Sequence, residues 1–547
     1  MFVGMASAVV ALSFLLRIYQ INGVELWIDE AMSLFRATTP GGLRPDVVLD
    51  PSPPLYYFLL RIWVHLAGTD EGALRLLSAV CGSLFVLLAI LAGRKLLNSR
   101  VGLWSGVFAS AAPVHLYYSQ EARPYALLVT LVMLTMVLLQ RAIERDRWID
   151  WTLASVAGLL ALFTHYFAIL ALVPAMGLVL VFVERSRINH YLRRMTTVVL
   201  ACGGLYLPWV WWAWVMTPHS SAELNWIQPW WQTGPPALMI PKSLEILGLG
   251  GHSELPTGGL VKIFPYVSFP PWARTLGLVT FVVLGMWVAV PWMDDRLEVP
   301  CIRKLKVWLW AMLFVPLVVL WIVSLYRPVY VLGRYDLLAF PAFTLLVGLG
   351  MAKAQIAAKG RPVLFLCLLL AMALPIAAKL SQYYEQSTKA GPISQSATAQ
   401  FLASRTKPGD VVVFTGLRGT TVLYYLKRLG FSWSAGECVN PDGRHFGCRM
   451  FPLEIERAPG TYDTDRVSES PQAIRDDLQV FLSALSQPDG VMWLVFGQGS
   501  SPDGRPVLPE PDLSFMAELV SRGFQYDGVQ VEGAPGIFRA TRADHRP

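Results

Sequence analysis

The chain has 547 residues, of which 54% are hydrophobic and 15% are charged. This composition excludes an ordinary soluble enzyme and is expected for a polytopic membrane protein. The formal net charge is +7, but the basic residues lie in short clusters between apolar runs, so no nucleic-acid partner is predicted.

Apolar runs long enough to cross a bilayer recur from the N-terminus to about residue 380. The first run has no basic start and no clear cleavage site before Glu25, so we interpret it as a retained span. The runs predict eleven transmembrane helices, near 3–21, 75–93, 101–118, 122–142, 149–164, 166–183, 195–215, 272–293, 306–325, 335–352 and 362–379.

Basic residues occupy every even-numbered connection between these spans, as the positive-inside rule requires of cytoplasmic loops. They are Arg94, Lys95 and Arg100; Arg141, Arg145 and Arg147; Arg185, Arg187, Arg193 and Arg194; Arg296, Arg303, Lys304 and Lys306; and Lys353, Lys359 and Arg361. The alternation predicts that the N-terminus lies inside, and that the odd-numbered connections and the C-terminus lie outside.

Two of the predicted outer connections are long. In 22–74, the segment 53–68 contains Tyr57 and is expected to lie in the membrane interface, because a twelfth span there would invert every later loop. The connection 216–271 is rich in Trp, Pro and Gly around 225–236, and we expect an ordered loop on the outer rim of the bilayer.

The composition turns polar after Leu380, so we divide the chain into a transmembrane domain, 1–380, and a soluble domain, 381–547. Two apolar runs bounded by glycines, 409–416 and 490–497, predict buried strands, and 419–430 between them predicts a helix. The second domain is therefore expected to be an extracytoplasmic α/β domain.

The six cysteines are too few for a disulfide framework, and no set of Cys and His residues has the spacing of a zinc site. Cys438 and Cys448 lie together in a polar region, and their pairing is left open against two free thiols. The sequence Asp463-Thr-Asp465 has a D-x-D form without a supporting fold. No cofactor is predicted, no metal site can be argued, and dependence on a divalent metal is left open.

Asp29 and Glu30 open the first outer loop, in the run "ELWIDEAMSLF". One interpretation is structural: Asp29 caps a following helix and favours its dipole. The other is functional: one carboxylate is a general base at the membrane surface, near an apolar wall that raises its pKa.

Three further outer connections are short and polar. "YYSQEARPY" contains Glu121 and Arg123, and Glu121 is interpreted either as a second acid of a site or as the partner of Arg123. The fifth connection contains His165, and the ninth contains Arg334. Arginine forks suit phosphate, so two arginines and a histidine on one face predict a site for an anionic ligand.

Several motifs occur together in a known order: W-x-D-E at 27–30, "PPLYY" at 53–57, "LRLLSAV" at 74–80, "SQEARPY" at 119–125, "THY" at 164–166 and "GRY" at 333–335. On these motifs the region 1–380 resembles the GT-C membrane glycosyltransferases of the protein O-mannosyltransferase and aminoarabinose transferase group, glycosyltransferase family 39. The resemblance implies inverting transfer of a sugar from a polyprenyl-phosphate donor to an acceptor hydroxyl of a protein, lipid or envelope glycan.

The resemblance also implies roles for particular residues. Asp29 of the Asp29–Glu30 pair is the expected base, and Glu121 is a second acid. The expected donor site comprises Tyr57, Arg123, Tyr125, His165, Tyr166, Arg334 and Tyr335. Two positions depart from the pattern: some relatives have Lys where this chain has His165, and Asp336 follows Tyr335 where an apolar residue is usual, so that it can pair with Arg334.

The expected partners are the lipid-linked donor, membrane lipids and the acceptor, and the expected location is a bacterial cytoplasmic membrane. A transporter or lipid flippase is the alternative function, and a non-catalytic envelope scaffold is a third. A transporter usually places its charges near the bilayer midplane, whereas the charges here lie at the outer ends of the spans, which favours the enzyme.

Overall fold

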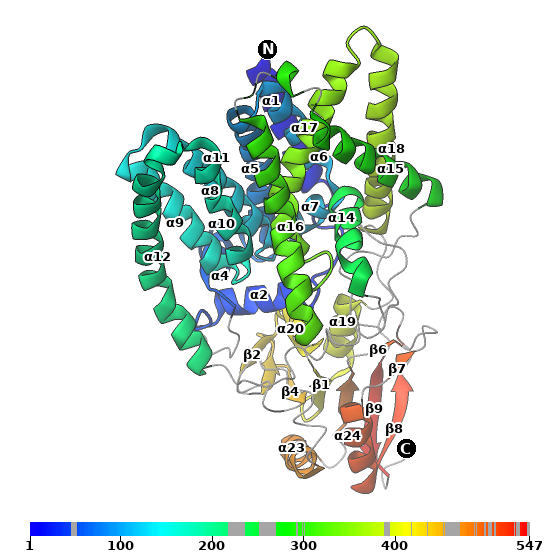
Figure 1. Ribbon diagram of the computed structural model, residues 1–547. Coiled ribbons are helices and arrows are strands. Elements are labelled where there is room, and N and C mark those ends of the chain that lie inside the picture. The colour runs from blue at the N-terminus through cyan, green and yellow to red at the C-terminus, as the bar shows by residue number, and fades with distance from the viewer. Residues whose placement is uncertain are drawn as a thin grey trace.

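The computed structural model forms a bundle of long helices with an α/β domain at one end (Figure 1). We call that end of the bundle the domain face. The structure describes residues 1–547 except 45–51, 217–235, 251–269, 292–293, 298, 300, 388–393, 417, 435, 452, 454–470, 486, 488–489, 497–498, 501–505, 508–509, 530, 532–535 and 544–547. The Trp-rich part of the loop predicted around 225–236 and the motif at Asp463 lie largely or wholly outside the described residues.

Each of the eleven predicted spans corresponds to a helix or to a broken pair of helices. They are α1 (Phe2–Ile18), α5 (Glu71–Leu96), α6 and α7 (Ser99–Ala111 and Pro113–Ser119), α8 (Tyr125–Arg145), α9 (Trp148–Thr164), α10 and α11 (Ala168–Met176 and Leu178–Phe182), α12 (Ile188–Met216), α15 (Pro271–Ala289), α16 (Ile302–Tyr326), α17 (Phe340–Ala357) and α18 (Pro362–Ser387).

The outer surface of this bundle is apolar. Within the described part of the chain, seven helices are long and apolar enough to cross a membrane, and shorter apolar helices accompany them. Leu200 and Trp211 on α12 are each 70% exposed, and Val363 on α18 is 71% exposed. Large apolar side chains at such exposure require lipid, so the protein is an integral membrane protein.

Shorter helices connect the spans. They are α2 (Ile28–Thr38), α4 (Leu55–Ala67), α14 (Met239–Leu249) and the 3₁₀ turns η1 (Arg185–Arg187), η3 (Pro236–Leu238), η5 (Asp295–Leu297) and η6 (Asp336–Ala339). Helix α4 corresponds to the segment expected in the interface. Its 13 residues reach only about 20 Å, which is short of the roughly 30 Å hydrocarbon core.

A buried arginine stabilises the break between α6 and α7, where Pro113 interrupts the helix. Arg17 of α1 is fully buried, and its guanidinium donates to the Ala109 carbonyl (3.2 Å) and the Ser110 carbonyl (3.1 Å). It also contacts Ser119 and His115 on α7. Carbonyls left without helical partners in a membrane are costly, so the bonds from Arg17 stabilise the break between α6 and α7.

Small residues allow close helix packing in the bundle core. A Cβ on Gly93 of α5 would lie 2.7 Å from the Cα of Gly102 on α6, which is too close for any side chain. Similarly, a Cβ on Gly348 of α17 would lie 2.8 Å from the backbone nitrogen of Ser105. These contacts are the small-residue interfaces expected between membrane helices.

The C-terminal domain contains a mixed sheet with the strand order β2-β3-β4-β1-β5-β9-β8. Its strands are β1 (Val411–Thr415), β2 (Ser432–Ser434), β3 (Glu437–Val439), β4 (His445–Phe451), β5 (Met492–Val495), β8 (Phe524–Val529) and β9 (Ile537–Arg542), with a separate pair β6 (Gly499–Ser500) and β7 (Pro506–Val507). Strand β1 pairs in parallel with β4 and β5, and the remaining pairs are antiparallel. The two predicted strands and the α/β class are confirmed.

Helices cover both faces of this sheet. They are α19 (Gln395–Arg405), α20 (Arg418–Arg428), α23 (Pro471–Ala484) and α24 (Glu510–Ser521). Strand β1 is buried throughout, with Val412 and Phe414 packed in the cluster that includes α20 and the bundle, and Val411 and Val413 in the cluster of α23 and α24. Such a continuous apolar run is typical of a parallel strand covered on both faces.

The question that the sequence left open about Cys438 and Cys448 is answered by the structure, in which they form a disulfide between β3 and β4. The predicted helix at 419–430 is α20, which lies between the sheet and the bundle (Figure 1).

Polar contacts attach the domain to the first loop of the bundle. Glu25 accepts hydrogen bonds from the Ser394 hydroxyl (2.6 Å) and the Gln395 amide (2.7 Å) at the start of α19. The Tyr425 hydroxyl accepts from the Leu26 amide at 2.9 Å, and Arg428 pairs with Glu71. The loop that leads into α2 is therefore held from the domain side.

We expect Glu25→Ala to loosen the domain at α19, because a carboxylate that accepts from the first amides of a helix stabilises that helix by about 1 kcal/mol. Hydrogen exchange of the peptide 395–405 in the detergent-solubilised protein should increase several-fold. Glu437→Ala on β3, where Glu437 is exposed, is the control. Equal protection in both variants would contradict the proposed contact.

Candidate active site

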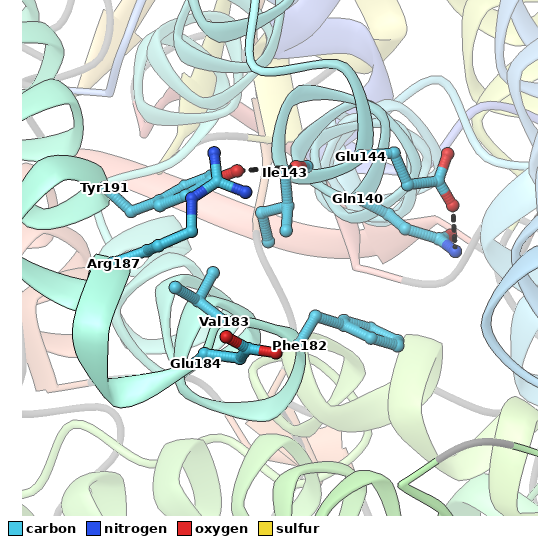
Figure 2. A pocket seen from close by; sticks show the side chains of 8 residues that line it. All are labelled: Gln140, Ile143, Glu144, Phe182, Val183, Glu184, Arg187 and Tyr191. Atoms are coloured by element: carbon cyan, nitrogen blue, oxygen red, sulfur yellow. Dashed lines mark hydrogen bonds between the residues drawn. The ribbon is translucent and has the colours of Figure 1, made fainter.

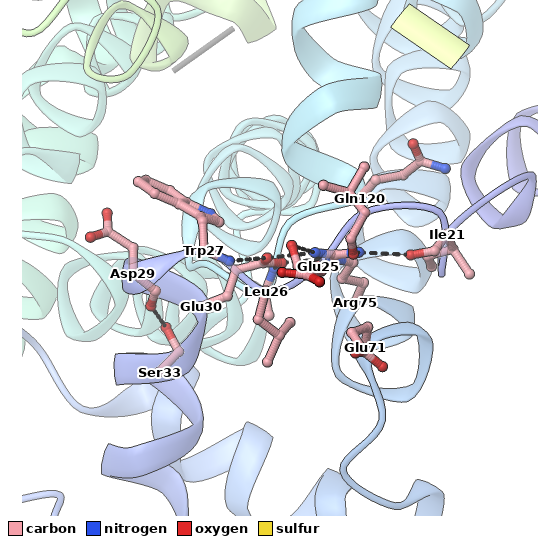
Figure 3. Close-up of polar contacts among 12 residues, drawn as sticks. Ile21, Glu25, Leu26, Trp27, Asp29, Glu30, Ser33, Glu71, Arg75 and Gln120 are labelled. Carbon is pink, nitrogen blue, oxygen red and sulfur yellow. Dashed lines mark hydrogen bonds and ion pairs between the residues drawn. The ribbon is translucent and has the colours of Figure 1, made fainter. Parts of the chain in front are cut away.

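The two acids of the opening motif have different surroundings. Helix α2 begins at Ile28 with Trp27 as its N-cap, so the interpretation of Asp29 as the cap is wrong. Glu30 is the residue whose carboxylate reaches back to the Trp27 amide, at 3.5 Å. Figure 3 shows the Asp29 carboxylate pointing away from Glu30.

Glu30 forms a buried ion pair with Arg75, in the second turn of α5. The Arg75 guanidinium donates to both oxygens of Glu30, at 2.8 and 2.7 Å, and the side chains are 5% and 1% exposed (Figure 3). Glu30 also accepts from the Ala122 amide at 2.9 Å. Arg75 further donates to the carbonyls of Ile21, Val24 and Glu25.

Asp29 instead faces two arginines from distant parts of the chain. Its Oδ2 lies 3.1 Å from Nη2 of Arg334 and 3.6 Å from Nη2 of Arg123. The Asp29 side chain is 27% exposed, which leaves it within reach of a ligand. These three residues were predicted to lie on one face of the membrane, and the structure brings them into contact.

Aromatic rings surround the arginines. The ring of Tyr125 lies under both guanidinium groups, with centroids 6.0 Å from Cζ of Arg123 and 5.8 Å from Cζ of Arg334. Trp27 also lies 5.7 Å from Arg334. Tyr335 packs edge-on against His165, with ring centroids 5.3 Å apart. Rings in these positions hold guanidinium groups in place without neutralising their charge.

His165 is a neutral hydrogen-bonding group in this site. Burial, together with the positive charges of the nearby Arg123 and Arg334, lowers the pKa of His165 to about 3. Its Nδ1 lies 3.1 Å from the Phe167 amide and accepts from it, so the ring proton is assigned to Nε2. His165 can therefore donate to an anionic oxygen without being charged.

Glu121 lies in the turn between α7 and α8 and is 4% exposed. Burial raises the pKa of Glu121 to about 8, and Glu30 adds to the shift. Glu121 is therefore mainly protonated at neutral pH. A protonated carboxyl group can donate a hydrogen bond as well as accept one.

Three buried polar atoms beside Asp29 have no hydrogen-bond partner in the part of the chain that the structure describes. They are Nε1 of Trp27, Nε of Arg123 and Oε2 of Glu121. Buried polar groups in folded proteins are nearly always paired, so a cluster of unpaired ones indicates that a ligand completes the site. The two N–H groups require an acceptor, and Glu121 suits a hydroxyl group.

The remaining residues predicted for the donor site lie around this cluster. Tyr57 is buried on α4, where the Arg36 guanidinium lies 3.9 Å from its ring centroid, and it lies near Arg123. Tyr166 lies in the turn with His165 and interacts with Tyr206 of α12. Their roles remain predictions.

Asp336 bears on the second departure from the family pattern. Its Oδ2 accepts from the Gly333 amide at 2.9 Å, which closes the turn that presents Arg334. The sequence did not predict this hydrogen bond between the Gly333 amide and Asp336.

Sequence reasoning missed Arg75 as a site-building residue, although it lies in the "LRLLSAV" motif. The available signal was an arginine within an apolar span, which in a membrane requires a buried acceptor. It also missed Gln120, whose side chain donates to the carbonyls of Arg17 and Tyr19 and accepts from the Tyr383 hydroxyl. These contacts fix the turn that contains Glu121.

Comparison with known proteins agrees with the resemblance seen in the motifs. The Dolichyl-phosphate-mannose-protein mannosyltransferase family matches residues 51–214. No curated protein sequence matches the chain. Because the family match includes "PPLYY", "LRLLSAV", "SQEARPY" and "THY", the predicted resemblance is confirmed over that region.

Solved structures with the same architecture are similar over most of the chain. ArnT from Cupriavidus metallidurans in the apo state has a TM-score of 0.57 at 14% identity, covering 99% of this chain and 98% of that chain. The same protein bound to undecaprenyl phosphate has a TM-score of 0.57 at 14% identity, covering 98% of this chain and 98% of that chain. The apo oligosaccharyltransferase of Archaeoglobus fulgidus gives 0.49 and 14%, covering 77% and 63%. The chain has the GT-C fold that was predicted, with a C-terminal α/β domain.

The buried pair predicts a strong coupling in stability. Arg75→Met or Glu30→Gln alone leaves one polar partner buried without its counterpart, which should cost about 3–5 kcal/mol of unfolding free energy. The double variant should cost clearly less than the sum of the two. Both single variants and the double variant are unfolded with denaturant in detergent. The partly exposed Arg522–Glu518 pair is the control, with a coupling below about 1 kcal/mol. Additive costs at Arg75 and Glu30 would contradict this prediction.

The raised pKa of Glu121 predicts a pH dependence of stability. Between its ordinary value of 4.5 and about 8, the folded state keeps a proton that the unfolded state has lost. The free energy of unfolding therefore falls as the pH rises through this range, by up to a few kcal/mol. Glu121→Gln should flatten the dependence of Tm on pH, whereas Glu437→Gln should not. Parallel curves for the wild type and Glu121→Gln would exclude the assignment.

Proposed function

We propose that the protein is an inverting glycosyltransferase that moves a sugar from a polyprenyl-phosphate donor to an acceptor hydroxyl. The observation that carries this proposal is the group of unpaired buried atoms around Asp29, together with two arginines. The N–H groups of Trp27 and Arg123 need a hydrogen-bond acceptor, which a phosphate supplies. Glu121 needs a hydroxyl group, which a sugar supplies. ArnT, whose structure has the same fold, has been solved with undecaprenyl phosphate.

In the proposed reaction Arg123, Arg334 and the Nε2–H of His165 bind the donor phosphate. Both arginines contact Asp29 in this structure, so a bound phosphate would compete for them and free the carboxylate. Asp29 then takes the proton of the acceptor hydroxyl as that oxygen attacks the anomeric carbon. The bond between the sugar and the phosphate oxygen breaks, and the arginines stabilise the charge on the departing phosphate.

The other two acids of the site, Glu30 and Glu121, have different roles in this proposal. Glu30 is a positioning residue, because both of its oxygens are occupied by Arg75 and by backbone amides. Glu121, mainly protonated, binds a sugar oxygen beside the reacting carbon. Tyr125 and Tyr335 hold the phosphate-binding groups, and Tyr57 and Tyr166 line the surrounding walls.

We further propose that the domain face is extracytoplasmic. Two features support this orientation: the basic residues that occupy every even-numbered connection, and the disulfide Cys438–Cys448 in the C-terminal domain. The donor phosphate would then be bound outside the cytoplasm, and the acceptor would be a protein, lipid or glycan of the envelope. Mass spectrometry of envelope glycans and glycolipids, with and without the protein, would identify it.

The transporter alternative makes a different prediction about the site. A translocation pathway places its ionisable residues near the bilayer midplane, between interrupted helices. In the described structure Asp29, Arg123 and Arg334 lie at the domain face, in or beside connections between spans. No observation specifically favours transport.

Asp29→Asn should lower the rate of sugar transfer by about 10³-fold, because the amide cannot accept the proton. Arg123→Ala and Arg334→Ala should instead weaken donor binding by about tenfold or more, because each removes a charge-assisted contact. Transfer is measured with a purified polyprenyl-phosphate sugar in detergent, and binding by titration with polyprenyl phosphate.

Asp442→Asn and Arg405→Ala are matched controls at exposed positions of the C-terminal domain and should leave both quantities unchanged. Full transfer activity in Asp29→Asn would exclude Asp29 as the base. Normal affinity in both arginine variants would exclude the phosphate site.

A further inference from the structure

A cavity of about 360 Å³ lies at the opposite end of the bundle from Asp29, where α8 ends and α12 begins (Figure 2). It is lined by Gln140, Ile143, Glu144, Phe182, Val183, Glu184, Arg187 and Tyr191. The connections that border it, after α8 and after α11, are the fourth and sixth, both basic. The proposed orientation therefore puts the cavity at the cytoplasmic membrane interface.

Gln140 presents an unsatisfied acceptor at this cavity. The residue is 2% exposed, and its Nε2 donates to the Lys95 carbonyl (2.9 Å) and to Oε1 of Glu144 (3.0 Å). These acceptors fix the orientation of the amide, since a flipped amide would oppose oxygen to oxygen. Its Oε1 is buried and has no partner in the described part of the chain. The missing partner is a hydrogen-bond donor.

The cavity is lined by two acidic side chains, Glu144 and Glu184, and by one basic side chain, Arg187. The Glu144 side chain is half exposed, and its Oε2 lies 3.6 Å from Nζ of Lys95. Glu184 forms no ion pair within the described residues. Arg187 lies over the Tyr191 ring at 5.3 Å and pairs with Asp146 at 3.5 Å. A ligand that complements this arrangement carries a cation with N–H donors next to an anion.

The helices that form the cavity also present apolar side chains to lipid. Leu180 on α11 is 63% exposed, and Leu200 on α12 is 70% exposed. A ligand with long acyl chains can therefore place its chains along these helices and its polar end in the cavity.

We propose that this cavity binds the headgroup of a phospholipid with a primary ammonium, as in phosphatidylethanolamine. The ammonium donates to Oε1 of Gln140 and to the carboxylates of Glu144 and Glu184, and the phosphodiester contacts Arg187. A quaternary choline has no N–H to satisfy Gln140. A glycerol headgroup has no cation to pair with the carboxylates of Glu144 and Glu184.

Native mass spectrometry of the full-length protein in detergent tests this proposal. The protein is titrated with phosphatidylethanolamine, phosphatidylcholine and phosphatidylglycerol that have identical acyl chains. We expect one molecule of the ethanolamine lipid to be retained about tenfold more strongly than the other two, as charge-assisted hydrogen bonds allow.

Gln140→Leu and Glu184→Gln should each remove most of this preference. Glu184 is exposed, so its variant keeps the test valid if the buried Gln140 variant fails to fold. Lys304→Ala, at an exposed position at the start of α16, is the control and should retain the preference. Equal retention of all three lipids, or an unchanged preference in Glu184→Gln, would overturn the proposal. Displacement by soluble glycerophosphoethanolamine at equal concentration would overturn the assignment to a membrane lipid.

Discussion

The buried ion pair between Arg75 and Glu30 is the contact on which the geometry of the active site depends. Arg75 joins the Glu30 carboxylate to three backbone carbonyls of the first loop, and Glu30 in turn holds the Ala122 amide. One guanidinium thus fixes α2, α5 and the turn before α8 relative to each other. Because both charges are out of water, separating them would leave a buried charge without its partner, so the start of α2, which carries Asp29, is held firmly.

Asp29 and Glu121 are both carboxylic acids of this site, but they differ in burial and in the charges around them. Asp29 keeps partial contact with solvent and faces two arginines, whereas Glu121 is buried and holds its proton to about pH 8. The proposed proton acceptor, Asp29, thus has a protonated carboxyl group near it. In the proposed mechanism this separates removal of the acceptor proton from recognition of the sugar, which two equivalent carboxylates would not do.

Much of the fold was predictable because the membrane imposes simple rules on sequence. Apolar length and the alternation of basic loops located each span, and the glycine-bounded runs located β1 and β5. Alternation also placed Asp29, Arg123 and Arg334 on one face, but it gave no distances. Of the two interpretations of Asp29, the capping role was wrong by two positions, since the N-cap of α2 is Trp27, a residue type that does not indicate a cap. Arg75, Arg17 and Gln120 act on carbonyls from remote segments, and such partners cannot be inferred from spacing along one chain.

The ion pair between Asp29 and Arg334 joins residues 305 positions apart in the sequence. Asp29 is synthesised with the first span, whereas Arg334 arrives only with the tenth, after most of the helices have entered the membrane. During biosynthesis Arg123 is therefore present long before Arg334, and the proposed phosphate site lacks its second arginine until the tenth span has been made. In the proposed mechanism, a chain that ends before residue 334 lacks one of the two arginines for the donor phosphate, so partial translation products would use the lipid-linked sugar poorly.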